Sequence, residues 1–344
     1  MVKKTTIVDI ASAAGVSVST VSRILNNKPD VAEATRQRVL QVIEDLRFAP
    51  QAPWQQLRSG RSRVIALHFP QDFNPPSTDI ITAAALQCER AGYSLNLVVS
   101  SLDESDLLAI YRSGQADGMI LMETVTADWR VNLLRQQGYP FVMIGRCADN
   151  AGLSYVDVDI AGGVSAAFRH LVELGHRKIG FVTIEPTAKH QQYGYATWAL
   201  HAYEQTCAQF GLEPCWQPLD FKLGHVQDIL ARFLATHPQL TAIVTTQYMS
   251  VPEILKALKV RGLCVPDDIS IVGLIDDVIA ELLTPPLTSI RLPASSMGAE
   301  AVRLLIDQLE GNEREPEQIL LPAELCIRGS TAPVRNMTAS RIPQ

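Results

Sequence analysis

The 344-residue sequence has no apolar run near the ~20 residues that a helix needs to cross a bilayer. Met1 to Thr6 carries Lys3 and Lys4, but the apolar segment of a secretory signal does not follow. These absences predict a cytoplasmic protein with no membrane partner. Apolar residues still make up 47% of the chain and charged residues 19%, which favours folded domains over a disordered chain.

The sequence also lacks the motifs of metal sites, cofactor sites and common catalytic centres. Its six cysteines form no C-x-x-C pair and have no histidine at metal-ligand spacing. No P-loop, G-x-S-x-G, H-E-x-x-H or G-x-G-x-x-G pattern occurs. The paired carboxylates Asp267 and Asp268 follow Val265–Pro266 and are typical of a turn. We expect no metal, no cofactor and no enzymatic activity.

Charge is distributed unevenly along the chain. Residues 1–63 hold ten Lys and Arg against five Asp and Glu, so this segment carries +5 and residues 64–344 carry −11. A basic head on an acidic body is what a protein needs if only the head contacts a polyanion. A solvated surface explains the same charge equally well, so charge alone leaves both interpretations open.

The first 46 residues have the pattern of three short helices. Ile7, Ile10, Ala11 and Ala14 recur at helical spacing, and Gly15 permits the left-handed turn that ends a helix. Ser17 is a candidate N-cap for a second helix, in which Val21, Ile24 and Leu25 face inward. A third helix is expected from about Glu33 to Leu46, with Val39, Ile43 and Leu46 on its inner side. The first two helices and their tight turn predict a helix-turn-helix.

The second helix of such a motif can enter the major groove of DNA. Arg23 can pair with guanine and Ser19 with several bases. Ser17, Thr20 and Asn26 suit contacts to phosphates, which set register rather than sequence.

The stretch TIVDIASAAGVSVSTVSRILNNKPDVAEATRQRVLQVIEDLRFAP resembles the head of LacI/GalR-family transcriptional regulators along its whole length. The resemblance implies that Val18, Ser19 and Arg23 read bases. One departure is Ala32, where the family usually has a serine that caps the third helix. The predicted DNA-binding residues are Thr6, Ser17, Val18, Ser19, Thr20, Ser22, Arg23, Asn26 and Leu57.

Residues 50–62 are expected to form a hinge or linker. Their composition supports about two turns of helix, which would be too short to persist alone in water. The resemblance implies that this helix forms when two copies meet in the minor groove, where Leu57 opens a central base step. Pro53 and Trp54 depart from the small or aliphatic residues that are usual there. Leu57 could also be simply an apolar linker residue.

Beyond residue 62, short β-rich runs alternate with amphipathic stretches, which predicts parallel sheets built from βα units. About 280 residues are too many for one sheet, so we expect two doubly wound lobes with a ligand cleft between them. The resemblance continues to about residue 333 and implies a periplasmic-binding-protein-like core with three crossings between lobes. The expected divisions are a helix-turn-helix domain at 1–49, a linker at 50–62, lobe one at 63–159 and 293–321, lobe two at 160–291 and 322–333, and a disordered tail at 334–344.

The positions that contact the effector in the family are unusually apolar here. Gly145 stands where the family usually has an acid, Ile275 where it has an aspartate, and Leu292 where it has a glutamine. Because a buried unpaired polar group costs ~1–3 kcal/mol, this loss of polar groups argues against a typical hexose mode and favours a less hydroxylated effector. The remaining candidates for effector contact are Phe73, Asn74, Arg146, Trp198, Phe221, Gln247 and Asp276.

The whole pattern predicts a homodimeric regulator, most simply a repressor, that binds double-stranded operator DNA under the control of a small-molecule effector such as a carbohydrate or related metabolite. Three alternatives remain from the residues: an orphan regulator without an effector, a solute-binding protein without DNA function, and an enzyme with a doubly wound core.

Overall fold

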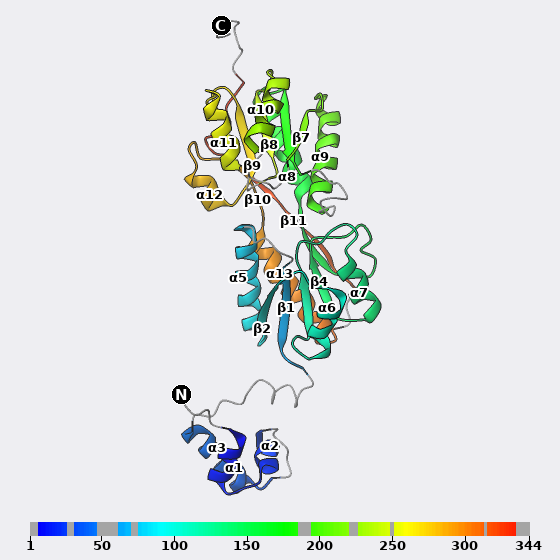
Figure 1. The fold of residues 1–344 in the computed structure, drawn as a ribbon, viewed down its shortest axis with the longest axis vertical. Coiled ribbons are helices and arrows are strands. Elements are labelled where there is room, and N and C mark those ends of the chain that lie inside the picture. The colour runs from blue at the N-terminus through cyan, green and yellow to red at the C-terminus, as the bar shows by residue number, and fades with distance from the viewer. Residues whose placement is uncertain are drawn as a thin grey trace.

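The computed structural model describes residues 6–25, 31–46, 61–69, 75–184, 194–219, 226–247, 251–312 and 315–334. They form a small helical head and a core of two stacked lobes (Figure 1). Residues 1–5, the linker between 47 and 60, and the tail from 335 lie outside this range, and so do Asn26, Leu57, Phe73, Asn74 and Phe221.

The head consists of α1 (Ile7–Ala14), α2 (Val18–Leu25) and α3 (Glu33–Asp45). Its small core is made of buried apolar side chains that α1, α2 and α3 all contribute: Ile10, Ala11, Ala14, Val21, Ile24 and Val39.

The predicted helix boundaries of the head are confirmed by its capping groups. Thr6 and Asp9 form a capping box at the start of α1, and Gly15 ends this helix in the left-handed conformation with φ 64°. Ala32 precedes α3 without a side-chain cap. One expectation is wrong: Leu46 is 38% exposed, because α3 ends at Asp45 and Leu46 lies beyond its last turn.

Lobe one contains a six-stranded sheet in the order β11-β5-β4-β3-β1-β2, and all of its pairings are parallel. Burial on both faces explains why its central strands read as continuous apolar runs. The strands are β1 (Val64–Phe69), β2 (Ser94–Val99), β3 (Gly118–Leu121), β4 (Phe141–Ile144), β5 (Tyr155–Asp159) and β11 (Gln318–Pro322), and the helices are α5 (Pro75–Arg90), α6 (Glu104–Arg112), α7 (Trp129–Gln137) and α13 (Ala294–Leu309).

Lobe two repeats this plan with the order β12-β10-β9-β8-β6-β7, in which only the edge strand β12 is antiparallel. The strands are β6 (Ile179–Thr183), β7 (Trp216–Pro218), β8 (Ala242–Thr245), β9 (Ser270–Leu274), β10 (Thr288–Arg291) and β12 (Glu324–Cys326), and the helices are α8 (Ile160–Glu173), α9 (Gly194–Phe210), α10 (Val226–Thr236), α11 (Val251–Val260) and α12 (Asp277–Leu282).

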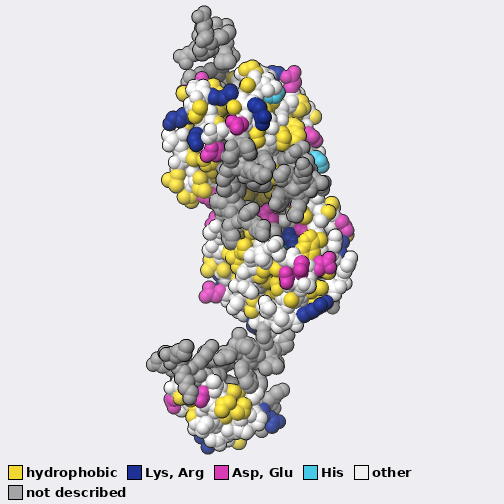
Figure 2. Space-filling view, viewed as in Figure 1, with side chains coloured by type: hydrophobic (Ala, Val, Ile, Leu, Met, Phe, Trp, Pro, Cys, Tyr) yellow, Lys and Arg dark blue, Asp and Glu magenta, His cyan; other side chains and the backbone are white. Residues whose placement is uncertain are grey.

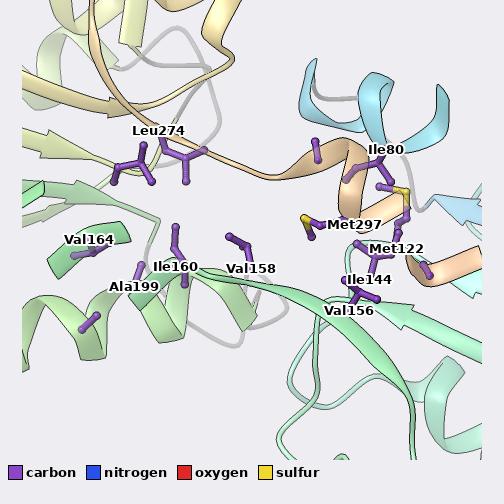
Figure 3. Packing of buried hydrophobic residues seen from close by; sticks show 14 of the residues in the cluster. Ile80, Met122, Ile144, Val156, Val158, Ile160, Val164, Ala199, Leu274 and Met297 are labelled. Atoms are coloured by element: carbon purple, nitrogen blue, oxygen red, sulfur yellow. The ribbon is translucent and has the colours of Figure 1, made fainter. Parts of the chain in front are cut away.

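The chain passes between the lobes three times: from β5 into α8, from β10 into α13, and from β11 into β12. Each crossing follows the carboxyl end of a strand, so the carboxyl ends of both sheets face the gap between the lobes. Figure 3 shows buried side chains following the first crossing from Val156 and Val158 to Ile160 and Val164. The predicted fold class, a helical head with two parallel-sheet lobes, is confirmed.

Apolar runs in the sequence predict strands at Val64–Phe69, Leu95–Val99, Gly118–Met122, Phe141–Gly145, Lys178–Thr183, Ala242–Thr245 and Ile269–Gly273, which correspond to β1, β2, β3, β4, β6, β8 and β9. The apolar pattern also predicts helices over Ile80–Ala91 and Ala299–Leu309, but α5 begins earlier, at Pro75, and α13 begins earlier, at Ala294. The first turn of α13 contains Ser295 and Ser296, which give no apolar periodicity to detect.

Within the described residues, no single helix is long and apolar enough to span a membrane. The helices α1 and α2 satisfy that test only as a pair bent by 100°, and they are the two helices of the head.

Candidate DNA interface and interlobe site

The second helix of the head presents an exposed polar face. Val18 is 40% exposed, and Ser19 and Arg23 are also exposed, whereas Val21 and Ile24 of the same helix are buried. The residues predicted to read bases therefore lie together on the solvent side of α2. An exposed valine can contact a thymine methyl group, and arginine can pair with guanine.

The start of α2 is held by a cluster of hydroxyl groups. The Ser17 Oγ accepts a hydrogen bond from the backbone N–H of Thr20 at 3.1 Å, which caps the helix. It also lies 2.7 Å from the Ser19 Oγ and 2.8 Å from the Thr20 Oγ1. The Ser19 hydroxyl has one donor and two acceptor positions, so it can bond a base while it keeps its bond to Ser17.

Two other predicted DNA-binding residues have structural partners in the head. The Thr6 hydroxyl donates to the Asp9 Oδ2 at 2.6 Å, and its backbone N–H donates to the same oxygen at 2.8 Å. Ser22 is half-buried on α2. Thr6 is thus engaged in the capping box, and a phosphate contact by Thr6 would compete with it.

Arg146 and Trp198 meet across the gap between the lobes. Arg146 follows β4 in lobe one and Trp198 lies in the second turn of α9 in lobe two. The guanidinium lies 4.5 Å from the centre of the indole ring, a cation–π distance. Gly194 permits this approach, since a Cβ there would lie 3.1 Å from the Arg146 carbonyl oxygen and 3.4 Å from the Trp198 Nε1.

This contact contains two buried donors that lack a hydrogen-bond acceptor within the described structure: the Arg146 Nε and the Trp198 Nε1. The Arg146 Nε is 3.2 Å from the Asp157 Oδ2, close enough for an ion pair but not aligned for a hydrogen bond. Burial raises the pKa of Asp157 to about 6, against the opposing effects of the Val158 N–H and Arg146. Buried donors favour a ligand with acceptor oxygens.

The other described candidates lie at neighbouring strand ends. Gln247 is buried just after β8, where its backbone N–H donates to the Thr245 Oγ1 at 3.0 Å. Asp276 follows β9 and caps α12 by accepting from the Val278 N–H at 2.9 Å. Asp276 lines a pocket of about 330 Å³ whose lining includes neither Arg146 nor Trp198.

The carboxylate next to Asp276 has a structural role. Asp277 pairs with Arg291 at 2.9 Å and with Arg328 at 2.6 Å, and these contacts connect α12 to β10 and to the segment after β12. The Asp276–Asp277 pair is therefore used for a helix cap and an ion-pair network.

A buried ionic network at the carboxyl edge of the lobe-one sheet was not predicted. Arg130 pairs with Asp128 through two hydrogen bonds of 2.9 Å and 2.6 Å, and both side chains are at least 95% buried. The Arg130 Nη1 lies 3.0 Å from the His68 Nδ1, and the His68 Nε2 lies 3.0 Å from the Ser100 carbonyl oxygen. Burial lowers the pKa of His68, with further lowering by Arg130. The network joins His68 of β1, the segments that follow β2 and β3, and the first turn of α7.

The backbone conformation at Gly145 explains why the acidic residue that the family usually has at this position is absent. Its φ of 103° lies outside the conformations that other residues adopt readily, and a Cβ would lie 3.3 Å from the Thr124 Cβ. An acidic residue there would strain the backbone and crowd the segment after β3.

Within the described residues, no group of three or more His, Cys, Asp or Glu side chains could hold a metal ion. Of the six cysteines, all of which are free, Cys88, Cys147 and Cys207 are buried.

Comparison with known proteins agrees with both halves of the architecture. Residues 6–51 match the family described as bacterial regulatory proteins, lacI family, and residues 168–331 match a periplasmic binding protein-like domain. The chain is 30% identical over 333 residues to the HTH-type transcriptional repressor PurR of Mannheimia succiniciproducens, covering 94% of this chain and 98% of that protein. It is 27% identical over 346 residues to the HTH-type transcriptional regulator DegA of Bacillus subtilis, covering 96% and 99%.

Solved structures support the same assignment. A complex of the transcriptional regulator CelR with cellobiose has a TM-score of 0.71 at 26% identity, covering 95% of this chain and 100% of that one. The lac repressor dimer bound to operator and the anti-inducer ONPF has a TM-score of 0.80 at 21% identity, covering 96% and 100%, which shows a shared fold. The molecule is therefore a helix-turn-helix transcriptional regulator rather than an enzyme. The chain belongs to the LacI family.

Proposed function

We propose that the head binds a specific DNA sequence through the exposed face of α2. The observation that carries this proposal is the joint exposure of Val18, Ser19 and Arg23 on a helix whose other face is buried. Arg23 pairs with a guanine and Val18 contacts a thymine methyl, while Ser17 and Thr20 approach phosphates. Thr6, Ser22, Asn26 and Leu57 complete the proposed interface from the sequence pattern.

The test is selection of binding sites by the full chain from a library of random DNA duplexes. We expect enrichment of two inverted half-sites, because two heads related by a two-fold axis read the same sequence on opposite strands. The Arg23→Ala variant should lose ~1–3 kcal/mol of specific binding and relax the preference at one position of each half-site. Arg112→Ala, the same change at an exposed position of α6 in the core, serves as the control. Unchanged preference in Arg23→Ala refutes its assignment.

We propose that the second head comes from a second copy of this chain. Large apolar side chains are exposed on α5 and β2 of lobe one and on α11 and α12 of lobe two, elements that lie on the same side of the molecule (Figure 1). Figure 2 shows hydrophobic side chains along this side of both lobes. Exposed apolar side chains gathered on one side of a molecule support a contact with another protein. On these four elements they are Leu86, Leu97, Val99, Val260, Val278 and Leu282, and Ile327 follows β12.

We propose that a small-molecule effector binds between the lobes and controls the affinity for DNA. The Arg146 Nε and the Trp198 Nε1 have no acceptor among the described residues, which favours a ligand rich in acceptor oxygens. A relative with this architecture was solved with cellobiose, which supports a sugar-related compound. Arg146, Trp198, Gln247 and Asp276 are the described candidates for effector contact, and Phe73, Asn74 and Phe221 complete the set from the sequence.

A thermal-shift screen of the full chain against sugars, sugar phosphates, nucleobases and organic acids tests the effector proposal. A ligand of the native state raises the melting temperature by mass action. A hit whose effect disappears in Trp198→Ala supports the site. If no compound of the panel raises the melting temperature, the result favours the alternative of an orphan regulator that binds DNA without a metabolite. We propose that the protein acts in the cytoplasm, where it has access to DNA.

A further inference from the structure

Asp117 directly precedes β3 and lies near the point where the chain enters the core. It is at the amino ends of the lobe-one strands, away from the gap between the lobes. Its Oδ1 accepts hydrogen bonds from the Ser62 N–H at 2.6 Å and from the Ser62 hydroxyl at 2.8 Å. Its Oδ2 accepts from the Arg63 N–H at 2.8 Å. One carboxylate thus holds two consecutive residues that precede the first strand. We call Arg61, Ser62 and Arg63 the junction.

Arg63 adds further constraints to the junction. Its φ of 52° is left-handed, which is uncommon for a residue other than glycine. Its guanidinium lies 5.5 Å from the centre of the Tyr93 ring, and its carbonyl oxygen accepts from the Ser94 N–H at 2.8 Å. The chain is therefore bent sharply just before β1 and held in that bend from two sides.

The sheet itself does not need the Asp117 carboxylate. The backbone N–H of Asp117 already donates to the Val64 carbonyl oxygen at 2.8 Å, and β1 pairs with β3 from Ile65 onward. The carboxylate reaches past this pairing to residues outside both strands. Its three hydrogen bonds fix the path of Ser62 and Arg63 just before β1.

We infer that Asp117 is a positioning residue for DNA recognition, one that couples the core to the head through the junction. The inference rests on the proposed DNA function. A fixed junction limits the positions that the head can take relative to lobe one, so less conformational freedom is lost when two heads bind adjacent half-sites. Non-specific binding depends mainly on phosphate charge and tolerates a freely moving head.

The test compares Asp117→Asn with wild type in the full chain, using the DNA site selected by wild type and a scrambled duplex of equal length. Asparagine keeps the size of the side chain but directs an N–H donor at an N–H of the junction. We expect specific affinity to fall roughly tenfold, a change typical of coupling between sites, while affinity for the scrambled duplex is unchanged. Asp103→Asn is the matched control, since Asp103 caps α6 in the same lobe and does not contact the junction.

Two results overturn the inference. The first is that folded Asp117→Asn binds the selected DNA site with the affinity of wild type, which would mean that the carboxylate has only a structural role. The other is an equal loss of affinity for both duplexes. Should Asp117→Asn fail to fold, Ser62→Ala decides, because it keeps both backbone hydrogen bonds to the carboxylate and removes the hydroxyl, which donates to the Asp117 Oδ1 and accepts from the Val64 N–H at 3.2 Å. About a threefold loss of specific affinity supports the inference and no loss overturns it. If wild type itself selects no DNA sequence, the proposed function fails instead.

Discussion

The guanidinium of Arg146 lies 4.5 Å from the centre of the Trp198 indole ring, and the two side chains belong to different lobes. The contact joins the segment after β4 in lobe one to the second turn of α9 in lobe two. Among the residues that the structure describes, the Arg146 Nε and the Trp198 Nε1 have no hydrogen-bond acceptor. We propose that a ligand with oxygen atoms binds to these donors. We propose that a molecule bound at this stack changes the spacing of the lobes.

Removal of the Trp198 ring should weaken this link between the lobes. We expect Trp198→Ala to reduce the free energy of unfolding of the core by about 2 kcal/mol, the value of a cation–π contact shielded from water. Trp129→Ala provides the control, because Trp129 is 40% exposed on α7. Denaturant titration measures both variants. Equal losses in the two would mean that the stack adds nothing beyond ordinary burial.

The Asp157 carboxyl should make stability depend on pH. Its pKa is about 6 in the native state against an ordinary value of 3.8, so the folded protein holds this proton more tightly than the unfolded chain. The stabilisation is complete below pH 3.8 and is lost as pH rises through 6. The asparagine of Asp157→Asn does not titrate, so this variant does not lose stability in the same way as pH rises. The free energy of unfolding of Asp157→Asn relative to wild type should therefore increase between pH 4 and 7 by on the order of 3 kcal/mol. A difference that is constant with pH would contradict the buried, raised carboxyl.

Arg130 should matter far more for stability than another arginine of the same helix. Arg130→Ala leaves the carboxylate of Asp128 buried without its partner, which costs ~3–5 kcal/mol. Arg135 pairs with Asp149 at 3.0 Å on the surface, and Arg135→Ala should cost at most about 1 kcal/mol. Chemical denaturation of the two variants checks the contrast. Similar costs would show that the network around His68 is not effectively shielded from solvent.

Gly145 should resist substitution more than Gly152, which also has a positive φ. Gly145→Asn meets both a φ of 103° and the Thr124 side chain, and we expect a loss of ~1–3 kcal/mol. Gly152→Asn is the matched change, since its φ of 70° suits asparagine and a Cβ there meets nothing within 4 Å. Thermal unfolding of both variants provides the comparison. A tolerant Gly145 would remove the structural reason for the missing acid.

The parts of the molecule that were predictable from sequence depend on local patterns. The caps, the left-handed Gly15 and the inward side chains of α1 and α2 are all set by residues within four positions of one another. The alternation of strands and helices gave the fold class in the same way, because the apolar periods of each element are visible in the sequence.

The contacts that were not predicted join residues far apart in the chain. His68 and Arg130 are 62 positions apart, and Ser62 and Asp117 are 55 apart. None of these four residues lies in a recognisable sequence motif. The folding of the parallel sheet brings the members of each pair together. Trp198 and Arg146 were both chosen as effector candidates, but nothing in the sequence indicated that they contact each other.

The central claim is that a molecule bound between the lobes controls DNA binding. The most direct test is the affinity of the full chain for its selected DNA site, measured by fluorescence anisotropy with and without each compound that stabilises the protein in the thermal-shift screen. We predict that at least one such compound changes the affinity by a factor of roughly 5 to 150, the usual range of coupling between two sites. Equal affinity in the presence and absence of every stabilising compound would contradict the account.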